Sequence, residues 1–257
     1  MWILTSLFLF SCHFESENKK HGRLYYLPNG RGSVEFNSLN DSLQLTEKKI
    51  FYQDGKIDFV ETLHVHKTEG YSKEYFRNGV LASKIFFKNG FSQGRSCYWD
   101  TLGNLETVSH HLHGKLFGDS YDFYPDGKLE SYRCLDYEEH TRYLVKYDVN
   151  GKIKKEEGLV LGQLMYYGDT IGISTGTNYT IEVCVSTPPG RKAKVQVIDS
   201  TIPNAKWIDL QVEDNYVWYE RKFTTKGVHR IYFKGTLVDK AGKLIATDSK
   251  PINVTVK

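Results

Sequence analysis

Apolar, aromatic and glycine residues recur with a period of 24 residues over the first two thirds of the chain. Each repeat unit contains a glycine, an aliphatic residue two positions after it and an aromatic residue four positions before it. The glycines are Gly55, Gly79, Gly103, Gly127 and Gly151. The aliphatic residues are Ile57, Leu81, Leu105, Leu129 and Ile153, and the aromatic residues are Phe51, Tyr75, Trp99, Phe123 and Tyr147. This agreement indicates a structural repeat in which each unit is stabilised by its neighbours.

The residues around each glycine predict two antiparallel strands joined by a tight turn. In four units the glycine follows Asp54, Asn78, Asp126 or Asn150. Asp-Gly and Asn-Gly are preferred in two-residue type I′ turns, because both positions accept a positive φ. We therefore predict type I′ turns at these glycines, with a positive φ at Gly127.

A two-residue turn also predicts which side chains face each other across each hairpin. Aromatic–aliphatic pairs of this kind stabilise a hairpin. The expected pairs are Tyr52 with Ile57, Phe76 with Leu81 and Tyr124 with Leu129. Asp100 and Asp148 replace this aromatic residue in two units, where we predict a turn one residue longer. Two further glycine series share the period, and these are Gly70, Gly94 and Gly118, and Gly90 and Gly114.

The pattern changes after Gly151, and a second domain is expected beyond a junction at residues 159–167. From residue 168 onward, about seven short strands separated by turns predict a β-sandwich. The segment 227–233 (GVHRIYF) resembles the penultimate strand of immunoglobulin-like domains. We therefore predict an all-β protein, with an elongated antiparallel hairpin repeat sheet over 22–158 and an Ig-like β-sandwich over 168–257. The sandwich is expected to fold alone.

The N-terminus has the features of an export signal. Residues 1–11 are uncharged and mostly apolar, and the polar segment HFESENKKHG follows Cys12. This predicts a signal peptide over 1–11. Residues 9–12 (LFSC) resemble a bacterial lipobox, although no Lys or Arg precedes the apolar run. The resemblance implies lipidation of Cys12 and a lipidated tether over 12–21. It also implies a membrane anchor in a bacterial cell envelope, with the outer membrane as the expected location.

Composition and spacing exclude several classes of function. A net charge of +3, without a cluster of basic residues, argues against nucleic-acid binding. Cys97, Cys134 and Cys184 show no CxxC spacing, so the sequence predicts neither a disulfide framework nor a zinc site. The histidine pairs of the repeat, His64 with His66 and His111 with His113, are expected on opposite faces of the sheet. No catalytic motif is present. We therefore predict no catalytic residue, cofactor or metal.

Two segments carry a resemblance to a known family. Gly70–Leu81 (GYSKEYFRNGVL) and Gly118–Leu129 (GDSYDFYPDGKL) resemble the MORN-type repeat, in the bacterial variant found in proteins often labelled as antitoxins. The resemblance extends over about residues 22–158. It implies an elongated antiparallel sheet used for protein or membrane contact, and it supplies no catalytic residue.

The leading functional hypothesis is a non-enzymatic envelope lipoprotein that acts as an interaction or structural scaffold. Its partner would be an unknown envelope protein or the cell wall. Phe51, Tyr75 and Phe123 are candidate contact residues on the face that is not part of the core. One alternative is a carbohydrate- or peptide-binding module centred on the sandwich, with stacking platforms at Trp207, Trp218 and Tyr219. A cytoplasmic antitoxin-like protein would require the N-terminus not to be an export signal.

Overall fold

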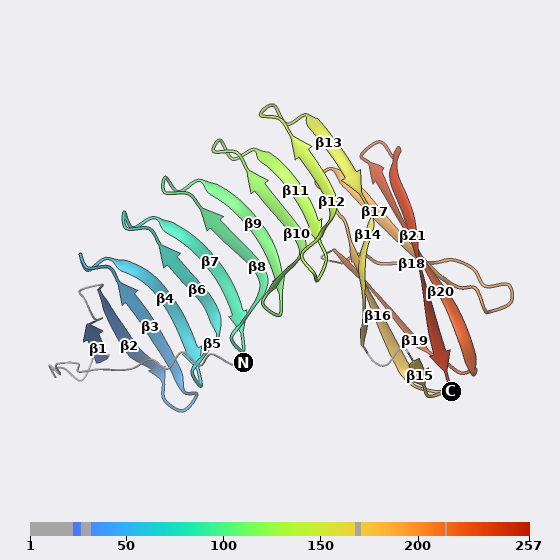
Figure 1. The fold of residues 1–257 in the computed structure, drawn as a ribbon, viewed down its shortest axis with the longest axis horizontal. Helices are drawn as coiled ribbons and strands as arrows, with labels where there is room; N and C mark the ends of the chain where they lie inside the picture. The colour runs from blue at the N-terminus through green and yellow to red at the C-terminus, as the bar shows by residue number, and fades with distance from the viewer. Residues whose placement is uncertain (1–22, 27–31, 168–170, 214) are drawn as a thin grey trace, which may run out of the picture. The chain divides into compact units, whose positions relative to one another are not determined.

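The computed structural model describes residues 23–26, 32–167, 171–213 and 215–257. The predicted signal peptide (1–11) and the tether (12–21), which begins at Cys12, lie outside the described residues. In the described part of the chain the regular elements are strands, which confirms the all-β prediction (Figure 1). No helix there is long and apolar enough to cross a membrane.

The repeat region forms an antiparallel sheet whose strands are hydrogen-bonded in chain order, as the period predicts. The short strand β5 is off this order and pairs with β4. The strands are β1 (Arg23–Tyr26), β2 (Ser33–Asn40), β3 (Leu45–Phe51), β4 (Ile57–His64), β5 (Lys67–Thr68), β6 (Gly70–Tyr75), β7 (Leu81–Lys88), β8 (Phe91–Trp99), β9 (Leu105–Leu112), β10 (Lys115–Phe123), β11 (Leu129–Leu135), β12 (Thr141–Tyr147) and β13 (Ile153–Gly158).

The C-terminal region forms two further sheets. The three-stranded sheet has the order β14 (Leu161–Tyr167), β16 (Asn178–Val185), β19 (Tyr216–Lys222). The five-stranded sheet has the order β15 (Ile171–Ile173), β21 (Leu244–Val256), β20 (Gly227–Asp239), β17 (Arg191–Asp199), β18 (Ile208–Leu210). Buried side chains of both sheets, such as Val183 on β16 and Phe233 on β20, belong to one apolar cluster. The two sheets therefore share a core, while the Ig-like assignment remains a prediction.

The turn glycines have the predicted backbone conformation, but the turn type differs from the prediction. Gly127 has φ +79°, whereas Asp126 is not at positive φ. The Gly127 amide donates to the Tyr124 carbonyl at 2.8 Å, and the Tyr124 amide donates to the Lys128 carbonyl at 2.8 Å. This is a three-residue loop, in which a type I turn is followed by a glycine bulge, and not a type I′ turn.

The longer loop changes the predicted cross-strand pairs by one residue. Phe123, not Tyr124, lies opposite Leu129. In the same way Phe51 lies opposite Ile57, and Tyr75 lies opposite Leu81. The units with Asp100 and Asp148 have the same bond from the turn glycine, and Tyr147 lies opposite Ile153. The longer turn predicted for these two units is therefore confirmed, and the two-residue turn predicted for the other units is wrong. Type I′ turns occur instead at the other ends of the strands, where β7 joins β8 and β9 joins β10. Asn89-Gly90 and His113-Gly114 have positive φ at both positions there.

Tyr52 and Tyr124, which directly follow the aromatic residues Phe51 and Phe123, join neighbouring hairpins. The hydroxyl of Tyr52 donates to the Tyr75 carbonyl at 2.6 Å, and that of Tyr124 donates to the Tyr147 carbonyl at 2.9 Å. Lysines four residues after these tyrosines make a parallel set of bonds, from Lys56 to the Arg77 carbonyl at 3.1 Å and from Lys128 to the Val149 carbonyl at 3.0 Å. These side chains therefore connect successive units along the repeat instead of packing within one hairpin.

Replacement of Gly127 with valine is expected to lower the free energy of unfolding by more than about 1 kcal/mol. The cost arises from the positive φ alone, since a Cβ at this position would meet no atom within 4 Å. Gly127→Asn is the matched control, because asparagine tolerates this conformation. Urea unfolding of the two variants measures the difference. Equal stability of both variants would contradict the strained turn.

The chain divides into two compact units, one containing residues up to 93 with 98–103 and the other containing 94–97 with 104–257. Among the described residues of the first unit, Val34 is the one apolar residue that is buried. Its strands thus form a single layer with half-buried side chains on both faces. The second unit contains an apolar cluster that includes Phe117, Tyr132 and Val145 of the repeat together with the sandwich core. The predicted boundary at 158–168 remains a prediction, but the buried cluster extends across it.

Candidate interaction surfaces

One face of the first unit carries an aromatic pair flanked by lysines. Tyr71 on β6 lies opposite Phe86 on β7, with the rings edge-to-face at 5.3 Å. Lys73 lies opposite both Val60 on β4 and Lys84 on β7. Alternation along the strands places these five residues on one face. We call them the Tyr71 surface.

The Tyr71 surface is open to solvent at its centre. Tyr71 is 52% exposed, and the Lys84 ammonium lies 4.2 Å from the centroid of its ring. Exposed aromatic side chains beside a cation are common among the residues that dominate binding energy at protein interfaces. The surface therefore has the composition expected of a contact site.

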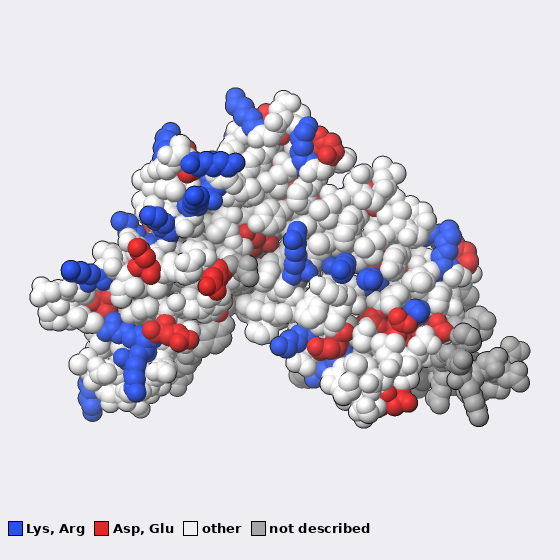
Figure 2. Space-filling view, turned by 180° about the vertical axis from the view of Figure 1, so that it is seen from behind, with Lys and Arg blue, Asp and Glu red and all other residues white. Residues whose placement is uncertain are grey.

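The lysines of this surface are not neutralised within the part of the chain that the structure describes. Neither Lys73 nor Lys84 forms an ion pair with a described carboxylate. Like charges directly opposite each other on neighbouring strands are destabilising. Elsewhere, acidic and basic side chains are interspersed, as the face shown in Figure 2 illustrates. The uncompensated pair at Lys73 and Lys84 thus favours an acidic partner.

The same face of the repeat is covered in the second unit. Asp119 and Tyr121 occupy the positions 48 residues after Tyr71 and Lys73, and Asp119 is only 5% exposed. This part of the sheet packs on the outer face of the three-stranded sheet, where the Phe117 ring lies 5.7 Å from the Tyr216 ring. One face of the repeat therefore binds a β-domain within the chain, and in the first unit the equivalent face is open.

A buried polar cluster lies at this contact between the repeat and the sandwich. The hydroxyls of Tyr132 and Tyr121 donate to the two carboxylate oxygens of Asp119 at 2.6 and 2.8 Å. The Thr187 hydroxyl donates to Asp119 at 3.3 Å, and the Thr187 amide donates to the Tyr132 hydroxyl at 2.8 Å. Burial raises the pKa of Asp119 to about 6, although these hydrogen bonds oppose the shift. These hydrogen bonds join β10 and β11 of the repeat to the segment that follows β16, and they therefore hold this part of the repeat sheet in place on the three-stranded sheet.

The raised pKa of Asp119 predicts a pH-dependent contribution to stability. Between about pH 4 and pH 6 the folded state holds a proton at Asp119 that the unfolded state has lost, so this contribution falls as pH rises through that window. The difference between this raised pKa of Asp119 and that of an ordinary aspartate corresponds to about 3 kcal/mol. Burial lowers the pKa of His111. Its effect on stability has the opposite sign to that of Asp119. Below pH 6.5 the unfolded state takes up a proton at His111 before the folded state does, so this contribution falls as pH falls.

The test is the difference between the wild type and Asp119→Asn, since His111 contributes equally to both. The thermal midpoint of the wild type is expected to fall relative to that of the variant as pH rises from 4 to 7. Calorimetry at several pH values measures this difference. A constant difference across the range would show that Asp119 has the same pKa in the folded and unfolded states.

The contact residues predicted from the sequence are half-buried in the structure. Phe51, Tyr75 and Phe123 each lie at the bulge beside a turn glycine, opposite the aliphatic residue of their own hairpin. They share one repeat position, which is not that of Tyr71, and they are less exposed than Tyr71. Their role as a contact stripe remains a prediction. The 24-residue pattern does not point to Tyr71, because the equivalent residues in the following units are Arg95, Asp119 and Tyr143.

The three aromatic residues proposed as stacking platforms lie in different environments. Tyr219 is buried and packs edge-to-face on Phe233 in the sandwich core. Trp218 is 43% exposed on the three-stranded sheet, stacked on Tyr216. Trp207 is also 43% exposed, but it lies beside the outer face of the five-stranded sheet. The three residues therefore do not form one site.

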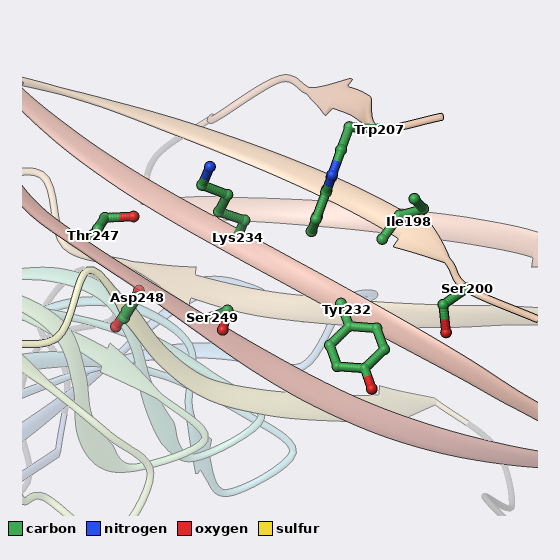
Figure 3. Close-up of a pocket in the computed structure, with 8 residues that line it drawn as sticks. All are labelled: Ile198, Ser200, Trp207, Tyr232, Lys234, Thr247, Asp248 and Ser249. Atoms are coloured by element: carbon green, nitrogen blue, oxygen red, sulfur yellow. The ribbon is translucent and has the colours of Figure 1, made fainter. Parts of the chain in front are cut away.

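Trp207 lines a shallow hollow of about 590 Å³. Figure 3 shows Tyr232 and Lys234 of β20 on the same side of the sheet, with Ser249 on the neighbouring strand. An exposed indole beside polar side chains is suited to stacking on a sugar or peptide group.

Among the residues that the structure describes, one group of side chains has the spacing of a metal site, namely Asp136, Glu138 and His140. The Asp136 carboxylate is already occupied by bonds from the His140 amide at 2.8 Å and the Arg142 guanidinium at 2.7 Å. These bonds hold the pKa of Asp136 below its ordinary value although burial opposes the shift. The arrangement is that of a capped turn, and we assign it no metal.

Comparison with known proteins identifies one repeat. The family model of the MORN repeat variant matches residues 68–89. The match spans β6, the Gly79 turn and β7, and it therefore includes four of the five residues of the Tyr71 surface. No curated protein matches the chain.

Proposed function

We propose that this protein is a non-enzymatic scaffold that binds a protein partner through the Tyr71 surface. The MORN repeat match supports a repeat-based binding or scaffold role. The observation that carries the proposal is the contrast between the two units: the same face of the repeat is covered by the sandwich at Asp119 and is open at Tyr71. A sheet face that already binds one β-domain is suited to bind another protein.

The chemistry of the surface restricts the partner. Tyr71, Phe86 and Val60 offer an apolar centre, and Lys73 and Lys84 offer two positive charges that form no ion pair with a described carboxylate. A complementary partner would present an apolar or aromatic side chain flanked by carboxylates. Such a pairing would neutralise the lysines and would make association sensitive to salt.

The proposed location is the bacterial cell envelope, with the chain held at the outer membrane by lipid on Cys12. The support is the lipobox-like segment at residues 9–12 and the apolar run before it. Cys12→Ala should move the protein from the membrane fraction to the soluble envelope fraction. Unchanged membrane association of that variant would contradict the lipid anchor.

The test of binding is site-specific photo-crosslinking in cells, with the crosslinker at position 71 of the full chain. Position 91 is the matched control, since Phe91 is also more than half exposed but is not part of the Tyr71 surface. We expect a discrete crosslinked product at position 71 and not at position 91. The partner, once identified, is then purified for affinity measurement.

Affinity measurements decide whether the chemistry is as proposed. Lys84→Glu should weaken binding of the purified partner at least tenfold, whereas Lys88→Glu, at the exposed end of the same strand, should change it little. A similar loss in both variants would indicate general electrostatics. No loss in either would contradict the role of the Tyr71 surface.

A second candidate function is binding of a carbohydrate or peptide at the hollow beside Trp207. The exposed indole and the neighbouring Tyr232 favour it. Titration with oligosaccharides, followed by tryptophan fluorescence, tests it with Trp207→Phe as the matched variant. A fluorescence change that persists in that variant would exclude this site.

A further inference from the structure

Two buried cysteines face each other where the repeat meets the sandwich. Cys134 lies on β11 and Cys184 on β16, and both are fully buried. Their sulfur atoms are 3.5 Å apart, although the residues are 50 positions apart in the sequence. Spacing along the chain gave no sign of this pair, because the contact depends on the packing of two different sheets.

Cys184 packs closely against a glycine on the neighbouring strand β14. Gly162 lies beside Cys184, and a Cβ at that position would be 3.0 Å from the Cys184 Cβ and 3.3 Å from its Sγ. Because residue 162 is glycine, no side chain at that position crowds the Cys184 sulfur. A disulfide requires the sulfurs to approach to about 2.05 Å. The shift of about 1.5 Å is within reach of small movements of both side chains.

We propose that Cys134 and Cys184 form a disulfide bond that cross-links the repeat sheet to the β-sandwich. The inference rests on the contact between these residues and does not depend on the Tyr71 surface. Export of the chain would bring it to an oxidising compartment, where such bonds persist. Cys97 is the remaining described cysteine, half-buried and outside the pair.

The reaction is a thiol–disulfide exchange with a disulfide oxidant, either an oxidoreductase or oxidised glutathione. The thiolate of one cysteine attacks the oxidant and releases one thiol, which leaves a mixed disulfide. The second thiolate attacks the protein sulfur of that mixed disulfide and releases the second thiol. The oxidant's disulfide is thus reduced to two thiols, and the protein's two thiols lose two protons and two electrons.

Burial determines when the bond can form. The contact with Cys134 and burial raise the pKa of the Cys184 thiol, so in the folded state little of the reactive thiolate is present. An oxidant has no access to fully buried sulfurs. The bond is therefore made while the chain folds, before the sheets close over it, and is afterwards protected from reductants.

A metal site is a weaker explanation for the pair. Two cysteines provide half of the four ligands that a structural zinc ion takes. The group of possible ligands found among the described residues is Asp136, Glu138 and His140, which does not include either cysteine. The pair therefore has the composition of a disulfide and not of a zinc site.

The test is thiol mapping of the full chain, refolded from denaturant in a glutathione redox buffer. The protein is unfolded in acid, alkylated before or after reduction, and digested with trypsin. We expect Cys97 to be alkylated without reduction, and Cys134 and Cys184 only after it. The peptide 134–142 should be recovered joined to the peptide that contains Cys184. Free Cys134 and Cys184 after refolding would overturn the proposal.

Thermal unfolding provides a second measurement. A disulfide that closes a loop of 50 residues should raise the midpoint by about 10 °C. Reductant present during refolding should therefore lower the midpoint of the wild type by this amount. The same treatment should not affect a variant with Cys134→Ala and Cys184→Ala, and Cys97→Ser should behave as the wild type. If the double variant fails to fold, the thiol mapping of the wild type still decides.

Discussion

Truncation of Tyr132 to alanine is expected to lower the free energy of unfolding by about 4 kcal/mol. Tyr132 is fully buried and packs on Tyr121, with ring centroids 5.4 Å apart. Its hydroxyl donates to Asp119 and accepts from the Thr187 amide, so truncation also removes one hydrogen bond from the buried Asp119 carboxylate and the partner of the Thr187 amide. Urea unfolding monitored by circular dichroism measures the change.

Two variants separate the contributions of the ring and the hydroxyl. Tyr132→Phe keeps the ring and should cost about 1–3 kcal/mol, the penalty for leaving buried polar groups unpaired. Tyr75→Ala removes a half-buried ring opposite Leu81 and should cost about 1 kcal/mol or less. If Tyr132→Ala were no more destabilising than Tyr75→Ala, the contact between the repeat and the sandwich would contribute little to stability.

A fragment of residues 168–257 is expected not to fold cooperatively, contrary to the expectation from its strand pattern. The fragment lacks β14, which is an edge strand of the three-stranded sheet. It thereby loses Leu161, which is fully buried against Gly235. Loss of a buried leucine side chain alone costs about 2–5 kcal/mol, which is a large part of the stability of a small domain.

The same fragment also loses the cover that the repeat provides. Phe117 and Tyr132 belong to the apolar cluster that contains Cys184 and Tyr216, so these would become exposed. A fragment of residues 104–257 retains both β14 and this cover, and we expect it to unfold cooperatively. Thermal unfolding and limited proteolysis compare the two fragments. A cooperative transition in the shorter fragment would show that the sandwich is stable without the repeat.

The turns show where local sequence was sufficient and where it was not. A glycine at positive φ is required both in a type I′ turn and in a type I turn with a glycine bulge. The spacing therefore predicted the conformation of Gly127 correctly. The two turns differ in the φ of the preceding residue, and aspartate is common in both. The pairing of Phe123 with Leu129 was settled by backbone hydrogen bonds that the dipeptide does not specify.

The sequence by itself determined the period, the strands and the turn positions, because each depends on residues close together in the chain. The strand pairing of the structure places Tyr71 opposite Phe86 on a common face. Only the tertiary structure decided which part of that face is covered. The sandwich packs over Asp119 and Tyr132, and this packing brings Cys134 to Cys184. These contacts join residues about 50 or more positions apart, and no local pattern records which distant surface will pack against a given strand.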